Sequence, residues 1–187
     1  MSKYVWLQDE LPLLAELSTQ SDQLLADYLS GWSNIKEAVF RRSFNMGQWA
    51  TEQSHQYDTV VNQPEGWRAT ELRFLGKNND HIEDYPTAAK MVHLLGADCT
   101  EATYLTLAPH TEMALHRDYE NRTRQSLRCH IPLMVPEGDC ALEVEGRIYD
   151  HHSSLAFDNQ ALHRAWNRTD HWRLIFSLTV TRSRLGL

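Results

Sequence analysis

The sequence lacks the features that mark secreted and membrane-spanning proteins. Its three cysteines (Cys99, Cys129 and Cys140) are odd in number and form no Cys-x-x-Cys pair, so no disulfide framework is indicated. Disulfides are rare in reducing compartments, and we therefore expect a cytoplasmic protein. No apolar run approaches the roughly 18 residues that cross a membrane, and residues 1–10 lack the apolar stretch of a signal peptide. Membrane association is not expected.

An excess of basic residues is also missing. Lysine and arginine number 18 against 25 aspartates and glutamates, which gives a net charge of −7. Proteins that grip nucleic acid usually carry a basic excess, so this function is disfavoured. The sequence is instead rich in histidine, with ten residues. Because histidine is the commonest metal ligand among side chains, the question is which of the ten do chemistry.

Length and composition are those of a folded globular protein. The 187 residues are 42% hydrophobic and 23% charged, and they contain no repeat or obvious linker. We expect a single domain over residues 1–187, with a helical and irregular part in residues 1–100 and a strand-rich core in residues 101–187.

The N-terminal part shows helical patterning. Leucines fall on helical stripes within residues 8–40, with a start at Ser21 and a stop at Gly31, and a second helix is predicted for residues 86–95. Residues 68–75 resemble a strand, whereas residues 44–66 are polar and irregular and are predicted to form a loop.

The C-terminal part is a series of short strands separated by turn signals. Such spacing favours a β-sandwich or jelly roll, with the N-terminal helices packed on one sheet, although a plain antiparallel α+β domain also fits. The predicted strands are 103–107, 112–119, 126–134, 140–149 (with a hairpin at 145–146), 154–157, 161–167 and 171–180.

The segment His116-Arg117-Asp118 carries the first candidate metal ligands. Residues i and i+2 of a strand face the same side, so His116 and Asp118 can bind one metal ion. A second histidine from a distant strand would complete the two-histidine, one-carboxylate set of non-haem Fe(II) oxygenases. The pair alone is weak, because about 0.6 such pairs are expected by chance in this composition. Two His-x-Glu pairs, beginning at His81 and His110, lie in loop or turn sequence and are interpreted as ordinary residues.

Later segments add residues that suit an anionic ligand. Arg128 and His130 share one face of a predicted strand, and His163 follows 47 residues after His116. Arg173 interrupts an apolar strand and shares a face with Ile175 and Ser177, while the opposite face is apolar and suits packing on the helices. A guanidinium facing inward needs an anion, and its planar fork suits a carboxylate, although an outward-facing arginine is the alternative.

Four stretches together resemble the aspartyl/asparaginyl β-hydroxylase family of Fe(II)- and 2-oxoglutarate-dependent oxygenases, to which bacterial proline hydroxylases are related. The resemblance spans about residues 104–181, and residues 1–100 match only loosely. The stretches are His116-x-Asp118, Leu127-Arg128-x-His130 with Pro132-Leu133, Phe157-Asp158 leading to His163 with Trp166-Asn167, and Arg173-Leu174-Ile175-Phe176.

The resemblance implies a double-stranded β-helix fold and a role for each matching residue. The implied iron ligands are His116, Asp118 and His163. Arg173 is implied to pair with the distal carboxylate of 2-oxoglutarate, with Arg128 and His130 as additional contacts. The family's small hydroxyl residue falls on Leu105, so Tyr104 or Thr106 is a candidate replacement.

The implied reaction consumes O₂ and 2-oxoglutarate, hydroxylates an unactivated C–H bond and releases succinate and CO₂. The expected substrate is a small amino-acid-like molecule, free, carrier-bound or in a short peptide, of Asp, Asn or Pro type. Arg117, Arg122 and Arg124 are candidates to bind its carboxylate, unless they lie on a solvated hairpin. The alternative function is a non-catalytic, cupin-type binding or sensor protein, and a homodimer is left open.

Three further features lie outside these motifs. His151-His152 lies in a turn-like segment and is interpreted as solvated. His171 alternates with Arg173 and is left open as a site residue, and Trp49 in the polar loop is a candidate for a substrate lid.

Overall fold

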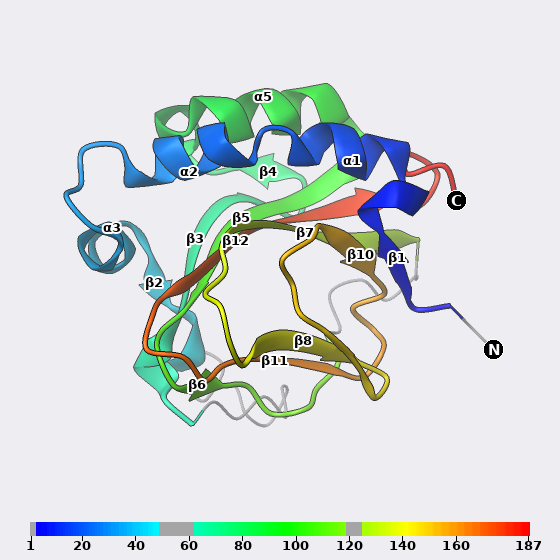
Figure 1. The fold of residues 1–187 in the computed structure, drawn as a ribbon. Coiled ribbons are helices and arrows are strands. Elements are labelled where there is room, and N and C mark those ends of the chain that lie inside the picture. Colours follow the sequence, from blue (N-terminus) through cyan, green and yellow to red (C-terminus); the bar gives the residue numbers. More distant parts are fainter. Residues whose placement is uncertain (1–2, 49–61, 119–124) are drawn as a thin grey trace.

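The computed structural model describes residues 3–48, 62–118 and 125–187 and consists of two antiparallel sheets that face each other, with helices on the outside of the larger one (Figure 1). This is the predicted α+β, mainly β double-stranded β-helix with N-terminal helices on one sheet. The described part contains no helix that is long and apolar enough to cross a membrane.

The larger sheet has eight strands in the order β1-β10-β7-β12-β5-β3-β2, with β4 paired to β3. Its strands are β1 (Val5–Leu7), β2 (Phe44–Asn45), β3 (Trp67–Phe74), β4 (Lys77–Asn78), β5 (Cys99–Leu107), β7 (Ser126–Met134), β10 (Leu155–Phe157) and β12 (Arg173–Thr181). The predicted strands 68–75, 103–107, 126–134, 154–157 and 171–180 correspond to five of these. Strands β1, β2 and β4 were not predicted, and β2 lies at the start of the segment 44–66 that was predicted to form a loop.

The smaller sheet has four strands in the order β6-β11-β8-β9. They are β6 (Thr111–Glu112), β8 (Cys140–Val144), β9 (Arg147–Tyr149) and β11 (His163–Asn167), and β8 and β9 form the predicted hairpin. The prediction of a strand over residues 112–119 was wrong in its extent. Strand β6 ends at Glu112, and the chain then bends before an isolated bridge at His116.

The helices lie across the outer face of the larger sheet (Figure 1). They are α1 (Pro12–Ser18), α2 (Ser21–Leu29), α3 (Ile35–Arg42) and α5 (Pro86–Leu95), with 3₁₀ turns at Gln8–Glu10, Pro64–Gly66, Ile82–Asp84 and Gly96–Asp98. The helical segment predicted over residues 8–40 is therefore divided. One division lies at Gly31, whose φ of +81° suits glycine, and the Asn34 side chain then caps α3 by accepting from the Glu37 backbone N–H at 3.0 Å.

Strand β12 shows how the sequence separates the two sides of the larger sheet. Leu174, Phe176 and Leu178 face the helices and join a buried cluster that includes residues of α1, α2 and α5. Arg173 and Ile175 point to the opposite side, into a cavity between the sheets. The alternation predicted for this strand is confirmed, because successive side chains of a strand point to opposite faces.

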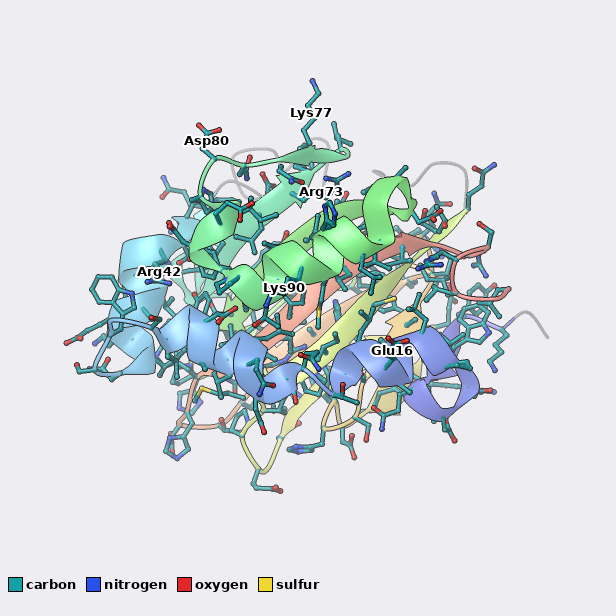
Figure 2. The ribbon with its side chains drawn as sticks, turned by 90° about the horizontal axis from the view of Figure 1, so that it is seen from above. Glu16, Arg42, Arg73, Lys77, Asp80 and Lys90 are labelled. Atoms are coloured by element: carbon teal, nitrogen blue, oxygen red, sulfur yellow. The ribbon has the colours of Figure 1, made fainter. Side chains whose placement is uncertain are left out.

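The helical layer presents charged side chains outward. Seen from above, Glu16 of α1 and Lys90 of α5 lie on the outer surface of this layer (Figure 2). Beneath it, Tyr104 of β5 is fully buried, its ring centroid lies 4.7 Å from that of Tyr28, and its hydroxyl donates to the Leu24 carbonyl at 3.2 Å. The helices thus bury the apolar outer face of the larger sheet, and its inner face lines the cavity between the sheets.

Candidate active site

A cavity between the two sheets brings the predicted site residues together. Its wall includes all six of them: His116, Asp118, Arg128, His130, His163 and Arg173. The side chains come from three strands and from the segment after β6. The rest of the wall includes apolar residues of both sheets, such as Leu107, Leu142, Phe157 and Ala165.

The two candidate histidine ligands are joined through their backbones. The His116 N–H donates to the His163 carbonyl at 2.8 Å, and the His163 N–H donates to the His116 carbonyl at 2.9 Å. This reciprocal pair places the two imidazole rings side by side, with centroids 4.3 Å apart. A residue 47 positions away in the sequence is thereby fixed next to His116.

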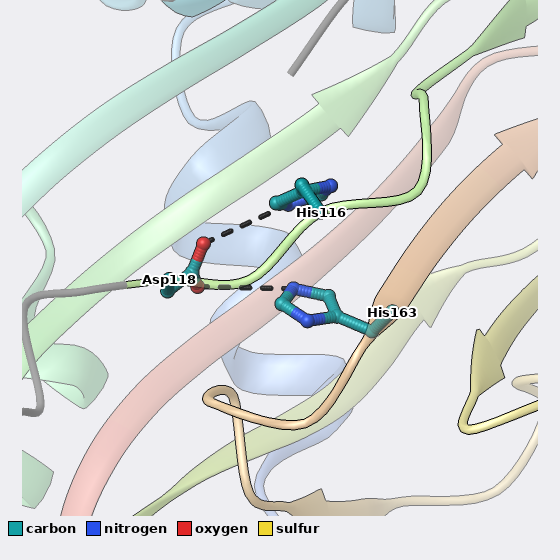
Figure 3. Close-up of side chains that lie close together, drawn as sticks. All are labelled: His116, Asp118 and His163. Atoms are coloured by element: carbon teal, nitrogen blue, oxygen red, sulfur yellow. Dashed lines mark ion pairs between the residues drawn. The ribbon is translucent and has the colours of Figure 1, made fainter. Parts of the chain in front are cut away.

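Asp118 completes a compact trio (Figure 3). Its two carboxylate oxygens lie 3.6 Å from His116 Nε2 and 3.8 Å from His163 Nε2, and the ligand atoms of the three residues all lie within 4.8 Å of one another. Asp118 reaches this place from an irregular segment rather than from the predicted strand. Its backbone N–H is held by the Asn159 carbonyl at 2.9 Å.

The hydrogen bonds of the two imidazoles fix where their lone pairs point. His116 Nδ1 lies 2.7 Å from the Ala114 carbonyl and His163 Nδ1 lies 2.9 Å from the Ala161 carbonyl, so each Nδ1 carries the proton. In the tautomers that these bonds select, each Nε2 directs a lone pair toward the Asp118 carboxylate, which is also an acceptor. Converging acceptors require a cation between them, and the donor set fits a divalent metal with positions left open.

Asp118 is held in its charged form. Burial raises the pKa of its carboxyl group, but the Arg128 guanidinium is the largest of the effects that oppose burial, and the pKa lies below the usual 3.8. Arg128 Nη1 lies 2.9 Å from Asp118 Oδ2, and its Nη2 lies 3.1 Å from Glu101 Oε2. Arg128 therefore bridges two carboxylates, and its implied contact with 2-oxoglutarate stays a prediction.

Arg173 is buried without a carboxylate partner among the described residues. Its side chain is 3% exposed, its Nη2 donates to His151 Nδ1, and its Nε has no hydrogen-bond partner in the described part of the chain. Burial lowers the pKa of the guanidinium to about 10, so it stays charged at neutral pH. A buried, partly unpaired guanidinium is costly, and this one faces the cavity that holds the trio, which indicates an anionic ligand.

The family model for aspartyl/asparaginyl beta-hydroxylase matches residues 30–183. The chain belongs to this family. The match includes all six predicted site residues and begins well before residue 104, so the family relationship covers more of the chain than the sequence motifs indicated.

Three solved structures illustrate distant likenesses to this hydroxylase-family chain. A 2OG-Fe(II) oxygenase family protein from Burkholderia pseudomallei is 9% identical, with 90% of each chain covered and a TM-score of 0.49. The viral collagen prolyl hydroxylase of Paramecium bursaria Chlorella virus-1 is 10% identical, with 60% of this chain and 77% of that chain covered and a TM-score of 0.39. A predicted oxalate decarboxylase from Thermotoga maritima is 9% identical, with 62% and 80% covered and a TM-score of 0.40. A search of curated protein sequences found no match, so the family assignment rests on the family model.

His151 is a buried residue beside the site that sequence reasoning missed. It was interpreted as solvated, but it is 1% exposed, and its Nε2 lies 3.1 Å from His130 Nδ1. The turn after β9 carries it inward, whereas the adjacent His152 remains exposed. No sequence signal distinguishes the two neighbours. His171 was left open as a site residue, and it is exposed and absent from the cavity wall.

Other sequence predictions for this hydroxylase-family site need correction. Tyr104 and Thr106 do not replace the family's hydroxyl, because Tyr104 faces the helices and Thr106 donates to the Arg68 carbonyl at 3.4 Å. The hydroxyls on the cavity wall belong to Thr103 and Ser177, which pair across β5 and β12.

The candidate substrate-binding groups lie elsewhere or outside the described residues. Arg117 is exposed and bonded to the Gln160 carbonyl at 2.6 Å, with Glu145 at 3.4 Å, and it does not line the cavity. Arg122, Arg124 and Trp49 lie outside the described residues, as does most of the predicted loop over residues 44–66.

The two buried histidines beside Arg173 make folding sensitive to acid. Burial, followed by the nearby charged groups, lowers the pKa of both His130 and His151 well below 6.5, so the folded protein keeps both neutral. The unfolded chain takes up a proton at each below about pH 6.5. We therefore expect the stability of the metal-free protein to be full above this pH and to fall below it, by up to about 1.4 kcal/mol per pH unit for each histidine.

Urea unfolding at several pH values between 7 and 5 measures this slope. His151→Gln should reduce the slope by about one proton, whereas replacing the exposed neighbour, His152→Gln, should leave it unchanged. Equal slopes for the wild type and His151→Gln would contradict the assignment of a neutral, buried His151.

Proposed function

We propose that this chain is an Fe(II)- and 2-oxoglutarate-dependent dioxygenase that hydroxylates an unactivated C–H bond and releases succinate and CO₂. One observation carries the proposal: a trio that needs a cation and a buried guanidinium that needs an anion line the same cavity. A divalent metal together with a dicarboxylate co-substrate satisfies both requirements.

The residues divide into three roles. His116, Asp118 and His163 would hold Fe(II), and Arg173 would pair with the distal carboxylate of 2-oxoglutarate. When bound with O₂, iron and 2-oxoglutarate supply the oxidising chemistry that hydroxylates the substrate. The chain itself orients the ligands through the backbone pair of the two histidines and through the Arg128 and Asn159 contacts to Asp118. Apolar walls exclude water from the reacting atoms.

We also propose that the substrate is a small amino-acid-like molecule, either free, carrier-bound or within a short peptide. The cavity wall outside the metal trio offers aromatic and apolar surface from Phe44, Trp67 and Phe74, together with the carboxylates of Glu71 and Glu101. A cytoplasmic location and the absence of nucleic-acid partners complete the proposal, on the grounds of cysteine use and net charge.

The test begins with ligand binding in the absence of oxygen. Addition of Fe(II) and 2-oxoglutarate to the folded protein should produce a weak visible absorption band that neither addition gives alone. A screen of amino acids and short peptides should then release succinate, with the hydroxylated product identified by its mass. Absence of the band in folded protein would argue against the proposal. A band without succinate for any substrate would favour the cupin-type binding protein instead.

A further inference from the structure

Three hydrogen-bonded side chains connect the cavity wall to a buried residue behind it. Arg173 Nη2 donates to His151 Nδ1, and His151 Nε2 lies 3.1 Å from His130 Nδ1. The exposed fractions of the three are 3%, 1% and 5%, so water does not replace these contacts. Arg173 and His130 line the cavity, whereas His151 does not.

Arg173 determines the direction of the hydrogen bonds that link these three side chains. A guanidinium has only donors, so His151 Nδ1 must accept and carries no proton. A neutral His151 then carries its proton on Nε2 and donates it to His130 Nδ1. His130 must in turn carry its own proton on Nε2. A single arginine thus fixes the tautomers of two histidines in sequence.

Two N–H donors are therefore left without a hydrogen-bond partner in the described part of the chain. Both His130 Nε2 and Arg173 Nε are buried and lack a hydrogen-bond partner among the described residues. The large majority of buried side-chain donors in folded proteins have a partner, so two unpaired ones on one cavity wall indicate a ligand that supplies acceptors. The positive charge of Arg173 favours an anionic one.

The backbone of His151 supports a dedicated role for this residue. Its φ is +66°, in the left-handed region that residues with a side chain enter uncommonly. The next residue bonds locally, with the His152 N–H donating to Asp150 Oδ1 at 3.1 Å. The turn therefore holds a histidine in a costly conformation and delivers its ring between Arg173 and His130, which is the pattern expected where strain serves a site.

We propose that His151 is a positioning residue that sets the His130 tautomer and holds Arg173, so that both present N–H groups to acceptor oxygens of an anion in the cavity. The identity of that anion as 2-oxoglutarate rests on the proposed function. His151 itself does not line the cavity, so it acts only through its two neighbours.

Three substitutions separate the two contacts. In His151→Leu both are lost, and we expect 2-oxoglutarate to bind about 10- to 100-fold more weakly to the Mn(II)-loaded protein, with Mn(II) affinity unchanged. His151→Asn places an amide oxygen near the position of Nδ1 and should preserve the Arg173 contact. His151→Gln places an amide N–H near the position of Nε2 and should preserve the His130 tautomer. Each of these two should lose less affinity than His151→Leu.

Calorimetry measures 2-oxoglutarate binding, and His152→Leu serves as the matched control because His152 is the exposed neighbour. In turnover, His151→Leu should raise the KM for 2-oxoglutarate far more than it lowers kcat. Wild-type affinity in folded His151→Leu would overturn the proposal. So would an equal loss of affinity in His152→Leu.

A second measurement does not depend on 2-oxoglutarate. Nitrogen-15 NMR of histidine-labelled, metal-free protein should show the Nε2–H tautomer for both His130 and His151, with signals assigned by the loss of one in each single variant. His151→Leu should disturb the His130 tautomer, whereas His151→Gln should preserve it. If the wild type does not bind 2-oxoglutarate, the proposed function fails while these tautomers still decide the positioning role. An Nδ1–H tautomer at His130 overturns that role.

Discussion

Replacing Asp118 with alanine should weaken Mn(II) binding by more than about 100-fold and abolish succinate formation. Asp118 is the only carboxylate of the trio, and its removal takes away the one negatively charged ligand. It also leaves the Arg128 guanidinium, now 2.9 Å from the vacated oxygen position, to repel a cation. Titration of metal-free protein with Mn(II), followed by electron paramagnetic resonance, measures the loss.

The control for this substitution is a carboxylate outside the cavity. Glu112 pairs with Arg168 at the surface, so Glu112→Gln should leave Mn(II) binding unchanged. The same comparison applies to histidines, where His116→Ala should remove metal binding and His110→Ala, at an exposed residue paired with Asp170, should not. If folded Asp118→Ala bound Mn(II) as the wild type does, the metal site would be wrongly assigned.

Replacing Arg173 with methionine should have the second large effect, on the co-substrate rather than the metal. We expect 2-oxoglutarate affinity to fall by about 100-fold or more, because two charge-assisted hydrogen bonds to a buried carboxylate are lost. Mn(II) affinity should stay within about threefold, since Arg173 is not one of the ligand trio. Calorimetric titration of the Mn(II)-loaded variant separates the two effects.

Stability supplies an independent check on Arg173→Met. Removing a buried charge that has no carboxylate partner and replacing it with an apolar chain of similar volume is often neutral or stabilising. The free energy of unfolding without ligand should therefore not fall by more than about 1 kcal/mol. Arg164→Met, at a partly exposed arginine that pairs with Glu143 outside the cavity wall, should change neither 2-oxoglutarate binding nor metal binding. Unchanged 2-oxoglutarate affinity in Arg173→Met would contradict the role of this residue.

The candidate metal ligands and the inward arginine could be predicted from short patterns together with the family resemblance. The two-residue spacing of His116 and Asp118, the later His163 and the charged residue within an apolar strand at Arg173 are all visible in the sequence. The faces of β12 were also predictable, because strand alternation is local and its apolar side is unbroken.

The remaining features depend on contacts that a sequence does not display. The hydroxyl expected near Leu105 was sought at Tyr104 and Thr106, but a shift of one residue along a strand reverses the face, and both point away from the cavity. Asp118 is placed by a backbone bond to Asn159, not by a regular strand. The inward turn at His151 depends on a left-handed residue and a buried arginine 22 positions away.

Strand β1 has a practical consequence for anyone preparing this protein. It pairs with β10, where Val5 lies opposite Phe157, and the Phe157 ring contacts His130 and His163 edge to face at centroid distances of 5.0 and 5.1 Å. A fragment trimmed to the matched residues 30–183 would omit β1 and leave β10 as an open sheet edge, which invites aggregation. It would also loosen the aromatic support of the site.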